Sequence, residues 1–161
     1  MKMTVLYHSK TGNTREMAAE IASGMELADG VEARCFSIDA IDPDWLSESR
    51  CVVLGSPTYM ASVSAAVKTF LEGAGRLGLA GKLGGAFATA DYIHGGGDLG
   101  IRLILDHMLV FGMLTYSGGG SRGKPVIHLG PVAIKGRLDE SREVFQIYGQ
   151  RMAEKALELF G

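Results

Sequence analysis

Six consecutive residues near the N-terminus carry the side chains best suited to bind an anion. Residues 9–14 read Ser-Lys-Thr-Gly-Asn-Thr, which places hydroxyl, amide and ammonium groups around one glycine. The apolar run before them, and the apolar side chains at steps of three and four after them, predict a strand at 3–8 and a helix at 14–28. The first amides of such a helix lack internal partners and carry partial positive charge, so a phosphate group can bind there. The alternative is an ordinary polar turn.

Each residue of this turn has an expected part in anion binding. We expect Gly12 to let the backbone approach the phosphate closely, and Asn13 to donate its side-chain amide. Asn13 followed three residues later by Glu16 also predicts a capping box. Lys10 either neutralises the phosphate or points away while its backbone amide binds. The remaining expected donors are the hydroxyl groups of Ser9, Thr11 and Thr14.

Residues 5–14, Val-Leu-Tyr-His-Ser-Lys-Thr-Gly-Asn-Thr, resemble the flavin mononucleotide (FMN) signature of the flavodoxins, in which this turn holds the terminal phosphate of the cofactor. The match covers the strand and the loop without a gap. The turn lacks the endings typical of nucleoside-triphosphate and dinucleotide loops, so those ligands are not expected. The resemblance implies the flavodoxin fold and FMN bound without a covalent link.

Strand-like and helix-like segments alternate along the rest of the chain. Further strands are predicted at 31–37, 51–55 and 82–89, and further helices are expected to start at Ser62, Asp98 and Ser141. This alternation predicts an α/β domain whose parallel sheet has helices on both faces. The flavodoxin resemblance implies a doubly wound sheet of five strands in the order 2-1-3-4-5. The fifth strand is predicted to start at 113–117, to be interrupted at 118–123 and to resume at 126–129.

The loop after the third strand is expected to contact the flavin ring, because ligands of doubly wound sheets bind beyond the carboxyl ends of the strands. An apolar strand ending in Gly-Ser-Pro-Thr-Tyr is a second point of resemblance to the flavodoxin-like family. Pro57 stiffens the turn beside Thr58, and Tyr59 or Met60 is expected to lie against the ring. Ala61 is small enough to bring backbone groups near flavin N5. The alternative is a loop whose apolar residues only pack together.

The loop after the fourth strand contains three consecutive glycines, whose backbone amides can approach a ligand closely. In flavodoxin-like reductases a glycine-rich loop at this place contacts the pyrimidine side of the ring, and donors there stabilise the anionic reduced flavin. Histidine side chains titrate near neutral pH, so His94 is either a proton donor to the substrate or a solvated loop residue. The residues of this loop expected at the cofactor are Thr89, Ala90, Asp91, Tyr92, Gly95, Gly96 and Gly97.

Composition and charge restrict the function classes. The chain has 161 residues, which suits one flavodoxin-like domain over 1–161. Its formal net charge is −2, and the sequence has no basic stripe that would bind nucleic acid. Flavodoxins that only carry electrons are usually strongly acidic, and this chain lacks that excess. The N-terminal apolar run is too short for a signal segment, and Asp106 and His107 interrupt the longest apolar helix. We therefore expect a cytoplasmic protein without membrane insertion.

The two cysteines, Cys35 and Cys51, fall in the second and third predicted strands. In the order 2-1-3 these strands lie on either side of the first strand, about 9–10 Å apart, which is too far for a disulfide. We therefore expect both cysteines to be small buried residues. The redox chemistry would then belong to a cofactor.

Two functions are consistent with these features. The chain is similar to the Trp-repressor-binding-protein group of quinone reductases at Pro57-Thr58, at 95–97, at Gly112-Met113 and at Gly149. That resemblance implies an FMN oxidoreductase that takes hydride from NAD(P)H and reduces a quinone or similar acceptor. That group has extra segments that build a tetramer. It also has a histidine at the position where this chain has Phe111. The alternative is a flavodoxin-type electron carrier that serves a redox partner protein.

Two stretches leave the quaternary structure open. We expect residues 117–136 either to fold over the flavin as a lid or to reach a second subunit. Within this stretch, Arg122 and Lys124 are expected either to contact a nicotinamide phosphate or to be solvated. The apolar helix at 101–110 is either wholly buried or packs in a homodimer.

Overall fold

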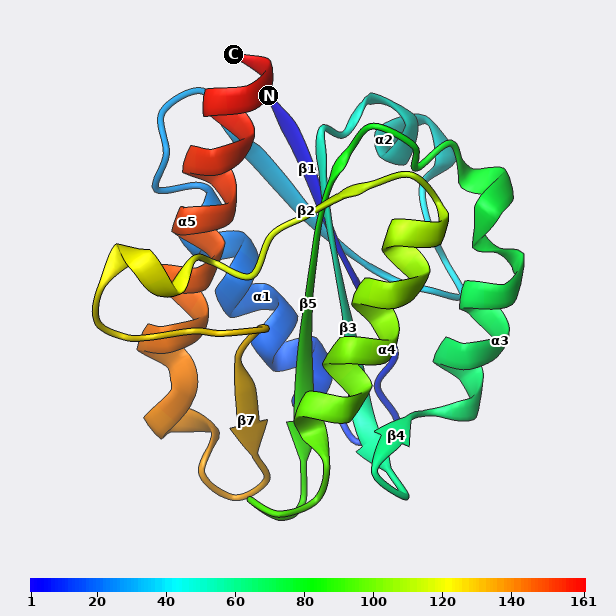
Figure 1. Ribbon diagram of the computed structural model, residues 1–161, viewed down its shortest axis with the longest axis vertical. Helices are drawn as coiled ribbons and strands as arrows, with labels where there is room; N and C mark the ends of the chain where they lie inside the picture. The colour runs from blue at the N-terminus through cyan, green and yellow to red at the C-terminus, as the bar shows by residue number, and fades with distance from the viewer.

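The computed structural model describes residues 1–161 as one central sheet with helices on both faces (Figure 1). The strands are β1 (Lys2–Tyr7), β2 (Glu32–Ser37), β3 (Cys51–Tyr59), β4 (Ser62–Val63), β5 (Leu83–Ala90), β6 (Leu114–Thr115) and β7 (Val132–Ile134). The helices are α1 (Asn13–Met25), α2 (Pro43–Glu48), α3 (Ala65–Gly73), α4 (Gly97–Val110) and α5 (Arg142–Phe160). Short 3₁₀ turns occupy Ala74–Leu77, Gly120–Arg122 and Leu138–Ser141.

The parallel strands lie in the order β2-β1-β3-β5-β6, which confirms the predicted flavodoxin-like order. The sheet has seven strands rather than the predicted five, because β4 pairs antiparallel with the end of β3 and the fifth position is shared by β6 and β7. Ser62 belongs to β4, so the prediction that it starts a helix is wrong. Helix α3 follows Ser64, whose hydroxyl oxygen accepts from the Val67 N–H at 3.3 Å.

The chain returns to the fifth strand position later than predicted. The prediction that the strand resumes at 126–129 is wrong, because pairing with β5 begins where the Ala88 N–H donates to the Pro131 carbonyl at 3.1 Å, and it continues through β7. Gly130 lies at the point of return, where a Cβ would be 2.1 Å from the Ala86 carbonyl oxygen. The chain therefore rejoins the sheet where a glycine lets the two backbones approach.

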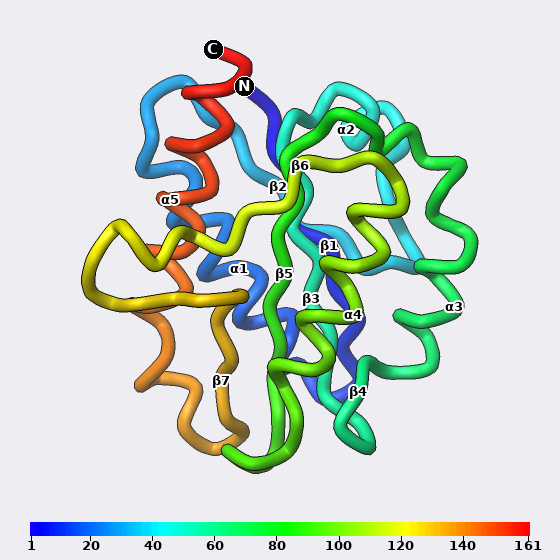
Figure 2. The backbone as a smooth tube through the Cα atoms, in the orientation of Figure 1, coloured from blue at the N-terminus to red at the C-terminus, as the bar shows by residue number.

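The segment between β6 and β7 folds against α5 (Figure 2). The guanidinium group of Arg151 holds it, and this residue is buried. Arg151 donates to the carbonyl oxygens of Pro125 at 2.9 Å and Lys124 at 3.3 Å, with longer contacts to two further carbonyls. In this structure the segment is therefore packed on α5 and is not a lid over the carboxyl end of the sheet.

Two hydrophobic cores flank the sheet. The core under α1 and α5 contains Phe87 and Phe145, whose rings meet edge to face, and the core under α2, α3 and α4 contains Leu54. Helix α4 buries one face in this second core, whereas its Leu109 and Val110 are exposed. The apolar helix is therefore not wholly buried within the chain.

Helices α1 and α5 cross at backbone contact distance because each has a glycine at the crossing. A Cβ on Gly24 would lie 2.0 Å from the Gln146 carbonyl oxygen, and a Cβ on Gly149 would lie 2.0 Å from the Ile21 carbonyl oxygen. No side chain fits at either position without moving one helix. The spacing between the two helices therefore depends on these glycines.

We expect Gly149→Ala to lower the free energy of unfolding by about 1–3 kcal/mol, because the added methyl group has no space against α1. Alanine is the better helix former by about 1 kcal/mol, so propensity alone gives the opposite sign. Gly75→Ala is the control, since nothing lies within 4 Å of its Cβ position. Urea unfolding measures both variants, and a Gly149→Ala protein as stable as the wild type would contradict the tight crossing.

Cys35 lies on β2 and Cys51 on β3 with β1 between them, and both are free thiols, as expected. Cys51 is fully buried, whereas Cys35 is only partly buried, so the expectation of two buried cysteines is correct for Cys51 alone. Burial raises the pKa of Cys51 to about 12. Burial, and secondarily the Glu26 carboxylate, raise the pKa of Cys35 to about 11.

These thiols make stability depend on pH in alkaline solution. The ordinary pKa of the thiol is 9.0, below both folded values, so the unfolded chain releases these protons first and the protein loses stability as the pH rises from about 9 towards 12. We expect Cys51→Ala to flatten this loss, although it lowers stability at neutral pH by leaving a cavity. Denaturant unfolding at several alkaline pH values measures the slope, and an equally steep slope in Cys51→Ala would contradict the role of this thiol.

Candidate functional site

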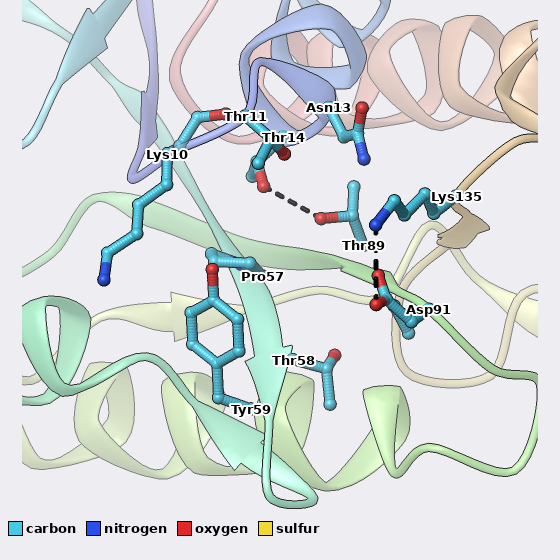
Figure 3. A pocket seen from close by; sticks show the side chains of 12 residues that line it. Lys10, Thr11, Asn13, Thr14, Pro57, Thr58, Tyr59, Thr89, Asp91 and Lys135 are labelled. Atoms are coloured by element: carbon cyan, nitrogen blue, oxygen red, sulfur yellow. Dashed lines mark hydrogen bonds and ion pairs between the residues drawn. The ribbon is translucent and has the colours of Figure 1, made fainter.

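A cavity of about 140 Å³ opens at the carboxyl end of the sheet (Figure 3). It lies between the turn after β1, the end of β3, the end of β5 and the residue after β7, at the edge where doubly wound sheets bind ligands. The residues that line it are Ser9, Lys10, Thr11, Asn13, Thr14, Pro57, Thr58, Tyr59, Thr89, Ala90, Asp91 and Lys135.

Gly12 shapes the turn between β1 and α1, with a φ of 99° in the left-handed region. Its N–H donates to Ser9 Oγ at 3.1 Å, which closes the turn. The backbone amides of Asn13, Thr14 and Arg15 have no hydrogen-bond acceptor within the protein. These free amides at the positive end of the α1 dipole can bind an anion.

The capping box predicted from Asn13 and Glu16 is wrong. Helix α1 begins at Asn13 with Gly12 as its N-cap, and no side chain caps it. The Glu16 carboxylate instead pairs with Arg142 at the start of α5. Because no side chain occupies the capping position, the first amides of α1 stay open to a ligand.

Buried hydroxyl groups form the base of the cavity. Thr14 Oγ1 of α1 and Thr89 Oγ1 of β5 lie 2.8 Å apart and share a hydrogen bond. On β3, Thr58 Oγ1 is buried and has no hydrogen-bond partner. Leaving such a hydroxyl unpaired costs about 1–3 kcal/mol. A ligand with a polar group at this position would remove that cost.

The residues after Pro57 form a tight hairpin. Thr58 and Tyr59 of β3 pair with β4, which leaves Met60 and Ala61 as a two-residue turn with φ values of 50° and 58°. Two consecutive positive φ values are typical of a type I′ hairpin turn. Tyr59 lines the cavity, whereas Met60 is 98% exposed at the tip.

The glycine-rich loop after β5 packs against this hairpin. Gly96 has a φ of 88°, and a Cβ there would lie 2.7 Å from the Ala61 Cα. Gly97 is buried at the first residue of α4. Tyr92 and His94 are exposed in the loop and do not line the cavity. The glycines therefore serve the contact between the two loops.

The sequence predicted every lining residue except Lys135. The predicted residues that do not line the cavity are Gly12, Met60, Ala61, Tyr92, His94, Gly95, Gly96 and Gly97. The role of His94 as a proton donor stays a prediction. Arg122 pairs with Glu154 of α5, so it is neither free nor at the cavity.

Lys135 is the lining residue that the sequence analysis missed. It follows β7, its N–H donates to the Ala90 carbonyl at 2.9 Å, and its ammonium lies 3.7 Å from an Asp91 carboxylate oxygen. No motif marks this lysine, because its place depends on where the chain rejoins the sheet. A prediction that the chain rejoins the sheet near Gly130 would have placed Lys135 at the cavity.

Comparisons with known proteins identify relatives. A family model described as a flavodoxin domain matches residues 4–89. The chain is 41% identical over 160 residues to a protein named flavodoxin from Clostridium saccharobutylicum, covering 99% of this chain and 100% of that one. It is 30% identical to an NAD(P)H dehydrogenase (quinone) from Nitrobacter winogradskyi, covering 76% of this chain and 75% of the relative. A solved flavodoxin, WrbA-like protein from Agrobacterium tumefaciens has a TM-score of 0.82 at 24% identity, covering 98% of both chains.

None of the helices is long and apolar enough to cross a membrane. No three side chains among the histidines, cysteines, aspartates and glutamates gather in a way that would hold a metal ion.

We expect Gly12→Ala to lose anion binding at this turn. Gly30→Ala is the matched control, because Gly30 also has a positive φ, of 77°, and lies in the turn between α1 and β2 with nothing within 4 Å of its Cβ position. Both variants should lose about 1–2 kcal/mol of unfolding free energy, since an L-residue is strained in this region. FMN titration should show weaker binding only for Gly12→Ala, and equal affinities in the two variants would contradict the assignment.

Proposed function

We propose that this protein, which belongs to the flavodoxin family, binds FMN in the cavity and uses it to reduce a quinone or a similar small acceptor with electrons from NAD(P)H. Bound FMN supplies reversible transfer of one or two electrons, while the chain supplies its position and surroundings. One observation carries the proposal: the cavity joins the free amides of Asn13 and Thr14 to a wall with the ring of Tyr59 and the unpartnered hydroxyl of Thr58.

The residues present fit both ends of FMN. The amides at the start of α1 and the hydroxyl groups of Ser9 and Thr11 would hold the phosphate, because charged acceptors form strong hydrogen bonds with such donors. Tyr59 would hold the ring by stacking, and Thr58 would donate to a ring or ribityl oxygen. Thr89 would sit beneath the ribityl chain, since its hydroxyl already meets Thr14 at the base.

The exposed loop after β5 gives this chain a route for protons. Asp91 lines the cavity, and His94 lies three residues further along the same loop in contact with solvent. The His94 imidazole is exposed to water, so it would pass a proton to an acceptor bound beside the loop.

Support for the NAD(P)H reaction comes from the quinone dehydrogenase relatives and from the net charge of −2, which lacks the large acidic excess that steers electron carriers to basic partner proteins. Phe111, which stands where the quinone reductase group has histidine, follows the carboxyl end of α4 and packs against His107 with ring centroids 6.4 Å apart. The ends of β3 and β5, whose residues line the cavity, lie at the other end of α4 (Figure 1). The departure at Phe111 therefore leaves this chain's own cavity unchanged.

One-electron carriage is a second candidate function, and chain length favours it. The flavodoxin relative from Clostridium saccharobutylicum is matched over its whole length. An NAD(P)H dehydrogenase (quinone) from Cupriavidus metallidurans needs 203 aligned positions to cover 99% of both chains, more than the 161 residues present here. A carrier would need only the bound cofactor and an exposed edge for its partner.

Anaerobic reduction of the FMN-loaded protein, followed by absorbance, distinguishes the two functions. We expect NADPH or NADH to bleach the flavin quickly in a single two-electron phase. Limiting dithionite is the parallel reaction, and it should give no long-lived spectrum of a one-electron-reduced flavin. A protein that ignores both nicotinamides and accumulates that spectrum under dithionite would instead be an electron carrier.

A further inference from the structure

The cavity contains a cation that the flavodoxin signature does not account for. We propose that Lys135 is the counter-ion of the FMN phosphate, and that its ammonium group exchanges the Asp91 carboxylate for the phosphate bound at the start of α1. This inference rests on the proposed binding of FMN and adds a residue from the far end of the chain to the phosphate site.

Strand pairing brings Lys135 to the phosphate side of the cavity. Ala133, two residues earlier, is buried in the core under α1 and α5, and residues two apart on a strand face the same side. Lys135 therefore leaves the sheet on the side of α1. Its ammonium group lies 3.7 Å from an Asp91 carboxylate oxygen, and its side chain lines the same cavity as Asn13 and Thr89 (Figure 3).

The other lysine of the cavity is directed elsewhere. Lys10 lies in the turn itself, but its ammonium is 6.0 Å from the centre of the Tyr59 ring, on the side of the hairpin (Figure 3). The charged side chains that line the cavity are Lys10, Asp91 and Lys135. Of the two lysines that line the cavity, Lys135 is therefore the one that is not directed towards the Tyr59 ring.

A cation beside the turn would add to the neutral donors of the phosphate site. A phosphate monoester carries about −1.5 to −2 charges at neutral pH, and the amides and hydroxyl groups of the turn are neutral donors. The Asp91 carboxylate adds a negative charge to the same cavity. An ammonium group that contacts the phosphate offsets part of this negative charge and forms a charge-assisted hydrogen bond.

The pair between Lys135 and Asp91 is loose enough to exchange. Its nitrogen and oxygen are 3.7 Å apart, and the two side chains are 59% and 57% exposed. Ion pairs this exposed contribute little to stability, because water solvates both partners when they separate. The carboxylate of Asp91 can therefore return to water when the ammonium meets the phosphate.

Comparison of FMN with riboflavin, which lacks the phosphate, tests this assignment. We expect Lys135→Met to weaken FMN binding about tenfold in low salt and to leave riboflavin binding unchanged. Lys135→Arg should restore FMN binding, since it keeps the charge. Lys155→Met is the control, because Lys155 pairs with Glu158 near the other end of α5. Quenching of flavin fluorescence measures each affinity, and circular dichroism checks the fold.

A double variant separates contact with the phosphate from simple masking of Asp91. If Lys135 contacts the phosphate, Lys135→Met should weaken FMN binding in the Asp91→Asn background as well. If Lys135 only neutralises Asp91, the loss disappears in that background, which overturns the proposal. Equal losses for FMN and riboflavin, or no loss for FMN, overturn it too.

The outcomes also separate this inference from the proposed function. A wild-type protein that binds FMN while Lys135→Met binds it equally well would refute the counter-ion and leave the FMN site standing. A wild-type protein that does not bind FMN would refute both.

Discussion

The close crossing of α1 and α5 is the constraint on which the position of the cavity depends. Gly24 and Gly149 let the two backbones touch, and this contact fixes where α1 lies on the sheet. The free amides at the start of α1 form one wall of the cavity, so a shift of the helix would move that wall relative to the ends of β3 and β5. A contact deep in one core thus sets the geometry of a site at the edge.

Locally unfavourable features collect around the cavity. Met60 and Ala61 hold positive φ values, Thr58 has an unpaired buried hydroxyl, and Asn13 begins a helix without a side-chain cap. Backbone strain and unpaired polar groups cost free energy wherever they occur, and they persist in proteins mainly where a ligand or a neighbouring element needs them. Here the neighbouring element is the loop around Gly96, and the proposed ligand is FMN.

The split of the fifth strand connects the far end of the chain to the same site. Residues between β6 and β7 leave the sheet and are held against α5 by Arg151. Gly130 then lets the chain approach Ala86 and rejoin the sheet beside the second half of β5. This detour places Lys135 next to Asp91 at the cavity. The phosphate turn and its proposed counter-ion therefore come from opposite ends of the sequence.

Residues 9–14 and nearly all of the cavity lining could be predicted from the sequence, because a turn between a strand and a helix carries its own donors and the ends of parallel strands meet at one edge. The strand order followed from the resemblance to the flavodoxins. The tertiary structure decided the features that depend on distant pairs. Glu16 was predicted to complete a capping box with Asn13 but pairs with Arg142, which no local pattern indicates. The return of the fifth strand depends on space beside Ala86, and Lys135 reaches the cavity as a result. Local sequence specifies which groups a segment can offer, whereas packing between distant segments determines which of those groups meet.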